Sequence, residues 1–327
     1  MTTAPSRDLA EWLADEFALG EPIRCEPVTR GAVGALYRLD IADEPIRSYA
    51  VKQFLSYSPT EEAVGMEVAF RDACARAGVP SPAPLRSRTG AVLVGDQGIG
   101  TRYRLYEWVD GPAGRDGDAD SMIILAGWMG VMHGLQVPVP PQMSIPAWYL
   151  RVEADWPELA RRVRAGRLPD AERLSALLPQ IIERTTLANH SATRDAIWCH
   201  RDLQPANMIN NPAGPVLVDW DNSGPLVPLQ ELGGLLLSVG DDIDLARELV
   251  AAHRAGGATA RITGPDCFAT GLASILNFLS EQLEVQLDPT APEHHDFAAA
   301  TVARIVRTLP TVAQLADLAQ ALADADS

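Results

Sequence analysis

The sequence predicts an α+β fold of two lobes, with a small N-terminal lobe built on an antiparallel sheet and a larger, mostly helical C-terminal lobe. Three observations support this prediction. Strand-like runs dominate residues 24–109, a polar and glycine-rich break follows at residues 110–120, and helical patterns dominate the remainder. A chain of 327 residues is long enough to bury a core in each lobe. We therefore expect one domain over residues 1–109 and a second over residues 110–327.

The N-terminal lobe is expected to combine short strands with two helices. Runs of β-branched, aromatic and other apolar residues bounded by turn residues predict strands, and the close spacing of the first three predicts an antiparallel meander. The second helix has a clear start, because Ser58 can accept from the amide of Glu61 and Pro59 suits the first turn. The expected elements are a helix over residues 8–18, strands over 24–29, 35–41 and 48–54, a helix over 58–77, and strands over 91–94 and 102–109.

The C-terminal lobe is expected to be helical apart from one strand pair. Apolar residues recur at helical spacing after the break, and proline and glycine residues interrupt them. A turn at residues 211–214 separates two short apolar runs, which predicts a hairpin. The expected elements are helices over residues 122–135, 148–165 and 170–187, a strand pair within 207–219, and further helices towards the C-terminus.

Composition argues against several classes of protein. The net charge of −16 disfavours nucleic-acid binding, which needs clustered lysine and arginine. No stretch approaches the roughly 18 apolar residues of a membrane span, and the first residues lack the pattern of a signal peptide. The four cysteines lack the paired spacing of structural zinc or a disulfide framework. We therefore expect a cytoplasmic protein that binds neither nucleic acid nor a membrane.

The 27 basic residues contain a single lysine, Lys52, and 26 arginines. A bias toward arginine explains why lysine is scarce, but it does not explain why one lysine remains. Lys52 lies in the third expected strand, at the end of the run Tyr49-Ala50-Val51-Lys52. A compact ammonium fits between phosphate oxygens and a carboxylate more easily than a broad guanidinium does. The alternative is an ordinary surface lysine on an edge strand.

The most informative segment is residues 198–221, WCHRDLQPANMINNPAGPVLVDWD. Asp202 and Asn207 lie five residues apart in a loop, and Asp219 ends an apolar strand twelve residues after Asn207. This arrangement can place a carboxylate and an amide beside one cation, with a second carboxylate nearby. Mg²⁺ prefers such oxygen ligands and bridges nucleotide phosphates, so Asn207 and Asp219 are candidate metal ligands. Asp202 is the candidate base that accepts the proton of an acceptor hydroxyl.

The spacing alone also fits a capped turn followed by a solvated aspartate. The preceding His200-Arg201, the strand-ending aspartate and the β-rich lobe upstream favour phosphoryl transfer, with His200 bracing the loop. In that chemistry Lys52 contacts the nucleotide phosphates and pairs with a glutamate of the next helix. Glu67 is the candidate partner and Glu62 is its nearest competitor. The alternative for Glu67 is a solvated glutamate on a helix surface.

Two further segments are candidates for nucleotide contact. Residues 29–34 (TRGAVG) separate the first two strands, where backbone amides near Gly31 and Gly34 could cover the phosphates. This segment lacks the usual glycine-rich spacing, and an ordinary hairpin turn is the alternative. Residues 107–111 (EWVDG) lie between the expected lobes, where the backbone of Glu107 and Val109 could bind an adenine edge. A simple domain linker is the alternative there.

Together these motifs resemble the aminoglycoside phosphotransferase and choline kinase family, the small-molecule branch of the protein-kinase-like fold. The resemblance spans about residues 25–235 and includes AVK at 50–52, Glu67, EWVDG, MHGL at 132–135, CHRDLQPAN and VLVDWD. It implies a protein-kinase-like two-lobe fold, with a nucleotide-binding N-terminal lobe and a catalytic, acceptor-binding C-terminal lobe. The site residues that it implies are the base Asp202, the metal ligands Asn207 and Asp219, and the phosphate-contacting pair Lys52 and Glu67.

The chain departs from the family's usual pattern at three places. Gln204 and Ala206 replace the usual histidine and glycine of the loop, Glu231 stands where the family commonly has an aspartate anchor, and the phosphate loop is irregular. None of these changes removes a group that the chemistry needs. A eukaryotic-type protein kinase is disfavoured, because VDWD replaces DFG and no APE motif follows.

The expected activity is transfer of the γ-phosphate of ATP, with Mg²⁺, to a hydroxyl of a small molecule; GTP is the alternative nucleotide. Residues 201–327 carry 17 acidic and 6 basic residues, a net formal charge of −11, which favours a cationic acceptor such as an aminoglycoside or amino sugar. Asp221 and Glu231 are the candidate acceptor contacts. The alternatives are a kinase of a sugar or choline-like alcohol and a catalytically silent nucleotide-binding regulator. The sequence contains no feature that indicates an oligomeric state.

Overall fold

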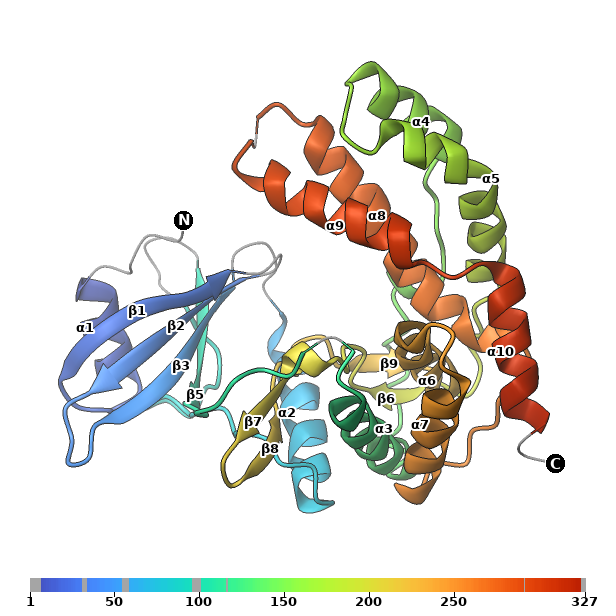
Figure 1. Ribbon diagram of the computed structural model, residues 1–327. Coiled ribbons are helices and arrows are strands. Elements are labelled where there is room, and N and C mark those ends of the chain that lie inside the picture. Colours follow the sequence, from blue (N-terminus) through green and yellow to red (C-terminus); the bar gives the residue numbers. More distant parts are fainter. Residues whose placement is uncertain are drawn as a thin grey trace. The chain divides into compact units, whose positions relative to one another are not determined.

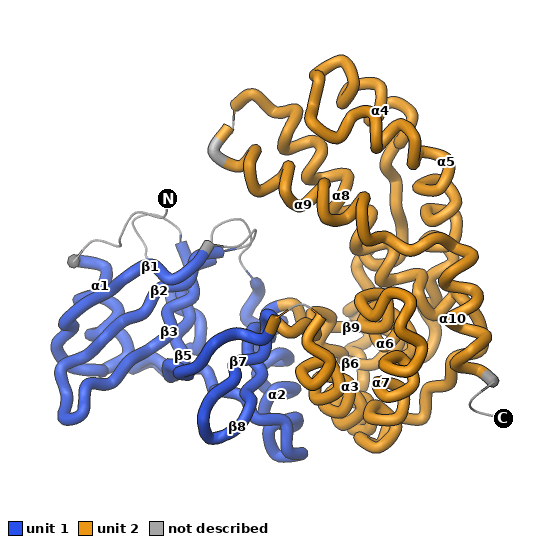
Figure 2. Tube along the Cα trace, in the orientation of Figure 1, with its two compact units in different colours: residues 1–114, 206–221 blue, residues 115–205, 222–327 orange. Residues whose placement is uncertain are grey.

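The computed structural model describes residues 7–30, 34–54, 59–95, 101–115, 117–290 and 292–324 (Figure 1). Its internal contacts divide the chain into two compact units, which Figure 2 shows in different colours. Unit 1 contains residues 1–114 and 206–221, and unit 2 contains residues 115–205 and 222–327. The sequence analysis placed the boundary at residues 109 and 110 and assigned residues 206–221 to the second domain. The contacts instead assign these residues to unit 1.

Unit 1 is built on a five-stranded antiparallel sheet with the strand order β1-β2-β3-β5-β4. The first three strands form the expected meander, and β5 pairs with the other edge of β3. Because β3 is an interior strand, Lys52 does not lie at a sheet edge as a surface lysine would. The strands are β1 (Pro22–Arg30), β2 (Gly34–Ile41), β3 (Arg47–Phe54), β4 (Val94–Gly95) and β5 (Arg102–Glu107).

The helix α1 (Arg7–Glu16) confirms the first expected helix and contributes to the core of unit 1. Leu13 on α1 is fully buried and belongs to one cluster with Leu39, Val51 and Leu105 of the sheet. These three sheet residues come from β2, β3 and β5, so the cluster joins the helix to the middle of the sheet. Burial of each such side chain contributes roughly 1.5–3 kcal/mol.

The helix α2 (Glu61–Arg76) begins later than the sequence analysis expected. Its N-cap is Thr60, whose hydroxyl accepts from the amide of Ala63 at 3.2 Å. The expected cap, Ser58, lies outside the described residues. Thr60 is a suitable N-cap because a hydroxyl directly before the first turn can accept from the amide three residues ahead. One face of α2 packs Val64 and Val68 against Phe54 of β3.

A hairpin of β7 (Met208–Asn211) and β8 (Gly214–Leu217) completes unit 1 and confirms the predicted strand pair and its turn. Main-chain bonds hold it to the N-terminal residues, because the amide of Gly114 donates to Met208 O and the amide of Leu217 donates to Pro80 O, each at 2.8 Å. Gly111 has a φ of 137°, and a Cβ on it would lie 2.4 Å from Asn210 O. The glycine of the EWVDG segment is therefore required by this close approach.

Unit 2 is mainly helical, as predicted, with a short antiparallel pair of strands that the sequence analysis did not anticipate. Strands of three residues are too short to show an alternating pattern. The helix expected over residues 148–165 begins only at Trp156, after a separate 3₁₀ turn over Ala147–Tyr149. The helices are α3 (Ala119–Gly134), α4 (Trp156–Ala165), α5 (Ala171–Ala188), α6 (Pro228–Leu236), α7 (Ile243–Ala255), α8 (Ala269–Leu287), α9 (His295–Thr308) and α10 (Val312–Asp324), and the strands are β6 (Ile197–Cys199) and β9 (Gly224–Leu226).

Helices α3 and α7 approach each other closely because glycines line their contact. A Cβ on Gly130 of α3 would lie 1.9 Å from the carbonyl oxygen of His253 on α7. A Cβ on Gly256, just after α7, would lie 2.4 Å from the carbonyl oxygen of Gly127. These contacts bring His133 of α3 within hydrogen-bonding distance of His253, at 2.8 Å.

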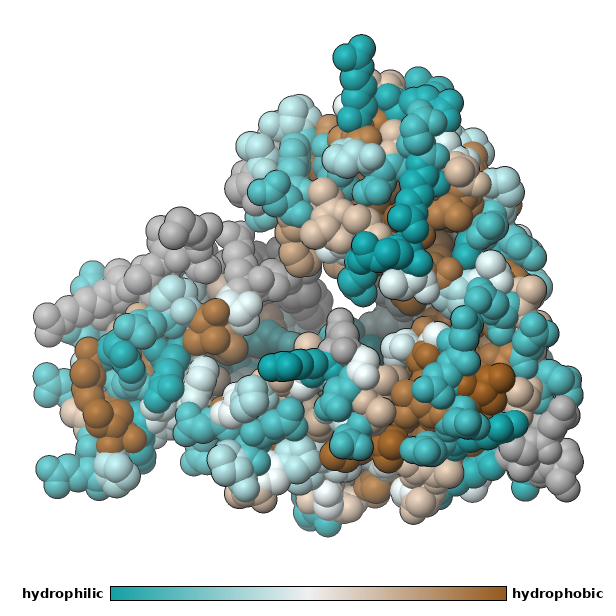
Figure 3. Space-filling view, viewed as in Figure 1, coloured by the Kyte–Doolittle hydropathy of each residue, from teal (hydrophilic) through white to brown (hydrophobic). Residues whose placement is uncertain are grey.

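Hydrophilic side chains cover much of the face of unit 2 that Figure 3 shows. In unit 2, Arg162 of α4 donates two hydrogen bonds to Glu284 of α8, at 2.6 and 2.7 Å. In the described part of the chain, no helix combines the length and apolar character that crossing a membrane requires.

Candidate functional site

Lys52 is the centre of a group of charged side chains in unit 1. Its Nζ lies 2.6 Å from Asp219 Oδ1 and also forms an ion pair with Asp221 Oδ2. The side chain is 18% exposed. Burial by itself would lower the pKa of Lys52, but the carboxylates of Asp221 and Asp219 outweigh this effect and raise it. The ammonium is therefore charged over the whole physiological pH range.

The expected pair of Lys52 with Glu67 is not formed. Glu67, buried on α2, instead accepts from Nη1 of Arg104 on β5 at 2.5 Å. Arg104 lies directly opposite Lys52 on the neighbouring strand, so both cations project from the same face of the sheet. Burial would lower the pKa of Arg104, but Tyr106, Glu67 and Asp221 outweigh it and raise the pKa. The sequence analysis identified the correct helix and glutamate but missed the cation that binds it.

The candidate metal ligands Asn207 and Asp219 come from the two ends of the β7–β8 hairpin. Asn207 is buried at the end of a 3₁₀ turn, and its carbonyl oxygen accepts from the amide of Val218 at 2.9 Å. This bond places Asn207 beside the residue that precedes Asp219. Asp219 has a φ of 63° and a side chain that is 39% exposed. Non-glycine residues with left-handed backbone are uncommon and concentrate at functional sites.

Trp220 fixes the backbone between the two aspartates. Its indole is 2% exposed, donates to Ser81 Oγ at 2.7 Å and packs edge-on against Phe70 of α2, with ring centroids 5.7 Å apart. With the tryptophan turned inward, Asp219 and Asp221 both reach Lys52. Asp221 was expected to contact the acceptor. In the structure its side chain is 13% exposed and its carboxylate pairs with Lys52 and Arg104, so contact with an acceptor stays a prediction.

The remaining candidate nucleotide contacts stay predictions. Gly31 lies outside the described residues. Gly34 begins β2, where a Cβ would lie 2.3 Å from the carbonyl oxygen of Gln53, so strand packing already requires a glycine there. Glu107 ends β5, and the amide of the following Trp108 donates to Ser48 O at 3.0 Å. Val109, the middle residue of the EWVDG segment, is partly exposed.

In unit 2, the loop after β6 holds Asp202. His200 is fully buried and its Nδ1 accepts from the amide of Asp202 at 3.3 Å, which confirms that His200 braces the loop. Asp202 is partly exposed, and its Oδ1 accepts from Gln204 Nε2 at 2.8 Å. Arg201 has a φ of 66° and donates from Nε to Asn222 O at 2.5 Å. The loop therefore presents a carboxylate whose main chain is anchored on both sides.

Glu231 of α6 was the second expected acceptor contact, which also stays a prediction. Its side chain is 5% exposed, and both of its oxygens are engaged. Oε1 accepts from the amide of Arg201 at 2.5 Å, and Oε2 accepts from His133 Nε2 at 2.7 Å. Burial would raise the pKa of Glu231, but the hydrogen bond from His133 outweighs it and lowers the pKa. Glu231 thus links the main chain at Arg201 to His133 of α3.

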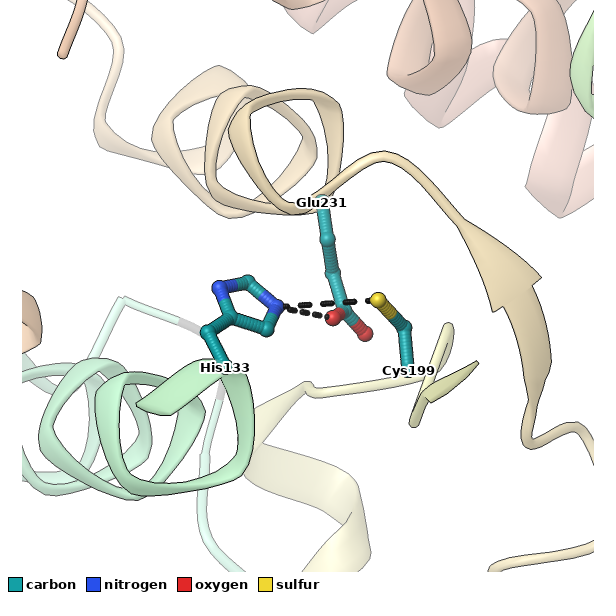
Figure 4. A group of neighbouring side chains, drawn as sticks. All are labelled: His133, Cys199 and Glu231. Atoms are coloured by element: carbon teal, nitrogen blue, oxygen red, sulfur yellow. Dashed lines mark hydrogen bonds and ion pairs between the residues drawn. The ribbon is translucent and has the colours of Figure 1, made fainter. Parts of the chain in front are cut away.

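Glu231, His133 and Cys199 form the buried cluster drawn in Figure 4, with ligand-type atoms within 4.8 Å of one another. Because the ionised carboxylate can only accept, His133 Nε2 donates to Glu231, while Nδ1 lies 2.8 Å from His253 Nε2. The separation of 2.7 Å between Nε2 and Oε2 is a hydrogen-bond distance. Two ligands of a tetrahedral zinc ion lie roughly 3.3 Å apart. The cluster is therefore a hydrogen-bonded anchor for the loop that carries Asp202.

Sequence reasoning missed Arg104, Tyr106 and His253. A signal for the first two was present, because Arg102, Arg104 and Tyr106 alternate along β5 and therefore share one face. A buried arginine on the same face as Lys52 follows only from the strand order, in which β5 lies next to β3. His253 carried no local signal, since a single histidine on a helix gives no indication of its partner.

The chain belongs to the phosphotransferase enzyme family, whose sequence model matches residues 24–268. The resemblance to aminoglycoside phosphotransferases and choline kinases is thereby confirmed. No curated protein has significant sequence similarity to the chain.

Solved structures share the fold at low sequence identity. A spectinomycin phosphotransferase in complex with ADP and spectinomycin has a TM-score of 0.66 and 13% identity, with 98% of this chain and 100% of that chain covered. An aminoglycoside phosphotransferase from Alicyclobacillus acidocaldarius has a TM-score of 0.62 and 16% identity, with 98% of each chain covered. The choline kinase LicA from Streptococcus pneumoniae has a TM-score of 0.54 and 13% identity, with 95% of this chain and 98% of that chain covered. The predicted α+β class, with an N-terminal antiparallel sheet and a helical C-terminal part, is confirmed.

Proposed function

We propose that the protein transfers the γ-phosphate of ATP, in the presence of Mg²⁺, to a hydroxyl group of a small molecule. The observation that carries this proposal is the position of Lys52, which lies on an interior strand against the carboxylates of Asp219 and Asp221. Two of the similar structures support a nucleotide substrate, one being a complex with ADP and another, an amicoumacin kinase, a complex with AMP-PNP. Since ATP is a cytoplasmic metabolite, we propose a cytoplasmic location.

The residues present fit a divalent cation. Asp219 supplies a carboxylate and Asn207 an amide oxygen, which are the hard oxygen ligands that Mg²⁺ prefers. A cation already lies against Asp219, because the ammonium of Lys52 is 2.6 Å from its Oδ1. When bound, Mg²⁺ would neutralise charge on the phosphate oxygens. In this proposal Lys52 contacts the phosphates, backbone amides near Gly31 and Gly34 cover them, and the backbone of Glu107 and Val109 binds the base.

In this proposal Asp202 is the catalytic base. Its carboxylate would orient the acceptor hydroxyl and accept its proton as the hydroxyl oxygen attacks the γ-phosphorus. The bond from the main chain of the neighbouring Arg201 to Glu231, together with the amide of Asp202 bound to His200, keeps the loop in place. Gln204 donates to Asp202 Oδ1 and so helps to orient the carboxylate.

We propose a cationic acceptor, namely an aminoglycoside or another sugar that carries amines. The net charge of −11 over residues 201–327 supports this choice, because it would attract such a molecule. Similar structures include enzymes named for spectinomycin and amicoumacin. With an aminoglycoside acceptor, the biological consequence would be antibiotic resistance. The resemblance to choline kinases favours a second candidate, a choline-like alcohol, which is also cationic.

The test is a screen of phosphate transfer from radiolabelled ATP, with Mg²⁺, to aminoglycosides, amino sugars, neutral sugars and choline-like alcohols. For the best acceptor, we expect Asp202→Ala to fold normally and to lower kcat by about 10²–10⁴-fold, the usual contribution of a general base. Full activity of this variant would remove Asp202 from the mechanism. Nucleotide binding without transfer to any acceptor would instead favour the silent regulator.

A further inference from the structure

Two buried cations face each other across neighbouring strands of unit 1. Lys52 on β3 and Arg104 on β5 are direct partners in the strand register, so their side chains leave the sheet side by side. Like charges in this position repel and destabilise a sheet unless other groups compensate them. Three carboxylates do so here, those of Glu67, Asp219 and Asp221.

The carboxylates are divided unequally between the two cations. Arg104 alone binds Glu67, Lys52 alone binds Asp219, and both bind Asp221. Asp221 is therefore shared, with Oδ1 at 3.1 Å from Arg104 Nη1 and Oδ2 paired with Lys52. Glu67 was the expected partner of Lys52, but these two described residues form no ion pair with each other.

The hydrogen bonds of Arg104 are concentrated on one nitrogen. Nη1 lies 2.5 Å from Glu67 Oε1, 2.9 Å from Tyr106 Oη and 3.1 Å from Asp221 Oδ1, although it has only two hydrogens to donate. Within the described part of the chain, Nε and Nη2 of this fully buried guanidinium have no acceptor. Three acceptors thus compete for two hydrogens, and a small rotation of the guanidinium would let Nη2 take one of them.

This arrangement determines what Lys52 does when Asp219 binds another cation. Without Arg104, Glu67 would lose its partner and Asp221 would keep only Lys52, so the ammonium of Lys52 would be the one cation left near both carboxylates. With Arg104 in place, Glu67 already has a partner and Asp221 has a second one. A metal ion bound to Asp219 would then replace the bond between Asp219 and the ammonium of Lys52. The ammonium would be able to move to phosphate oxygens nearby.

We propose that Arg104 is a positioning residue: it holds Glu67 and Asp221, so that Lys52 is available to the phosphates of a metal-bound nucleotide. The role that kinase-like lobes give to a lysine–glutamate pair is divided here between two cations. This inference rests on the proposed function, because it assigns Arg104 an effect on nucleotide binding that is exerted through Lys52.

The test measures the dissociation constant of Mn²⁺·ADP, from the free Mn²⁺ signal in electron paramagnetic resonance, for the full-length chain. We expect Arg104→Met to weaken binding about tenfold, the effect of losing about 1.4 kcal/mol, and Arg104→Lys to recover part of the loss. The matched control is Arg102→Met, on the same strand and face, which removes a more exposed ion pair with Glu61 (2.6 Å). We expect this control to bind Mn²⁺·ADP within about twofold of the unaltered protein.

A second comparison separates positioning from a purely structural role. If Arg104 acts through Lys52, then adding Arg104→Met to Lys52→Met should change the affinity by less than about twofold, since no ammonium remains to be positioned. An undiminished tenfold effect in the Lys52→Met background would overturn the proposal. Thermal unfolding of each variant reports whether it folds. Should Arg104→Met fail to fold, Arg104→Lys and Glu67→Gln allow the same comparison.

The outcomes distinguish this inference from the function on which it rests. An unaltered protein that does not bind Mn²⁺·ADP contradicts both. Binding by the unaltered protein, together with unchanged affinity in Arg104→Met, contradicts only the role of Arg104. Support would come from weaker binding in Arg104→Met, partial recovery in Arg104→Lys and no further loss in the Lys52→Met background.

Discussion

At the scale of single residues, Lys52 allows a requirement for positive charge to be distinguished from a requirement for a compact side-chain end. Its side chain is 18% exposed, and its ammonium pairs with both Asp219 and Asp221. Removal of one partner from a buried ion pair costs about 3–5 kcal/mol, because it leaves an uncompensated charge. Replacement by arginine keeps the charge but substitutes a planar fork for a compact donor. Lysine at this one position, in a chain with 26 arginines, is consistent with a requirement of shape.

We expect Lys52→Arg to lower kcat/KM for the nucleotide by about 10- to 100-fold, since each factor of ten corresponds to about 1.4 kcal/mol. The free energy of unfolding should change by less than about 1 kcal/mol, because the charge that compensates the aspartates is retained. Steady-state kinetics and denaturant unfolding measure the two quantities. Unimpaired kinetics would show that the ammonium has no special role.

A second residue-scale feature is the buried carboxylate of Asp40 on β2. It is 5% exposed and accepts from Arg24 at 2.6 Å, from Arg38 at 2.9 Å and from Ser48 at 2.6 Å. Burial would raise the pKa of Asp40, but the hydrogen bonds from Ser48, Arg24 and Arg38 outweigh it and lower the pKa to about 2. The folded state therefore binds a proton less readily than the unfolded chain.

This shift predicts a pH-dependent contribution to stability. Because the folded pKa is below the unfolded value of about 3.9, the stabilisation is complete above about pH 4 and is lost as the pH falls toward 2. We expect Asp40→Asn to lower the free energy of unfolding by about 1–2 kcal/mol at pH 7, after discounting for the half-exposed Arg24. Urea unfolding at pH 7 and pH 2.5 checks this. A difference that is equally large at pH 2.5 would contradict the ionic origin.

At the scale of elements, the contact of α3 with α7 depends on glycine. Gly130 allows the two backbones to approach until a Cβ would lie 1.9 Å from His253 O. The same contact holds His133 near His253 and so supports the bond from His133 to Glu231, at 2.7 Å. Packing of two helices therefore supports the anchor of the loop that carries Asp202.

We expect Gly130→Ala to lower the free energy of unfolding by about 1–3 kcal/mol, because the added methyl group forces the helices apart. The matched control is Gly65→Ala on α2, where a Cβ would meet nothing within 4 Å. That substitution should leave stability unchanged or raise it by up to about 1 kcal/mol, since alanine is the better helix former. Thermal unfolding compares the two. Equal effects at both positions would mean that α3 and α7 can separate without cost.

At the scale of the whole molecule, charge is the dominant property. The chain carries a net charge of −16, of which −11 belongs to residues 201–327. A field of one sign increases the encounter rate with oppositely charged ligands and is screened by salt, with a Debye length of about 8 Å at physiological ionic strength. The salt dependence of the reaction rate should therefore report whether the acceptor is cationic or neutral.

For an aminoglycoside acceptor, we expect kcat/KM to fall about tenfold when NaCl is raised from about 20 to about 200 mM, because attraction of a multivalent cation is screened. For a neutral sugar acceptor at the same nucleotide concentration, the change should be less than about twofold. Initial rates with subsaturating acceptor measure both. Equal salt dependence for the two acceptors would argue against electrostatic attraction of the substrate.

The sequence alone determined the order of the elements and the chemical groups of the candidate site. Alternating and helical periods, turns and capping residues are local, so they predicted the meander, the hairpin and most helices. Asn207 and Asp219 lie directly beside the predicted hairpin, so their places in the chain could be predicted from local patterns. Boundaries were less accurate, as with the cap at Thr60, since neighbouring polar residues offer similar caps.

The tertiary structure decided which side chains meet. Glu67 binds Arg104 and not Lys52, and the carboxylates of Asp221 and Glu231 are both paired inside the protein. These ion pairs and hydrogen bonds depend on the strand order and on how deeply each helix packs. Neither can be predicted from the spacing of residues in the sequence. The sequence thus predicted which charged residues belong to the candidate site. The tertiary structure determined which of them form ion pairs, because a buried charge without a partner is strongly destabilising.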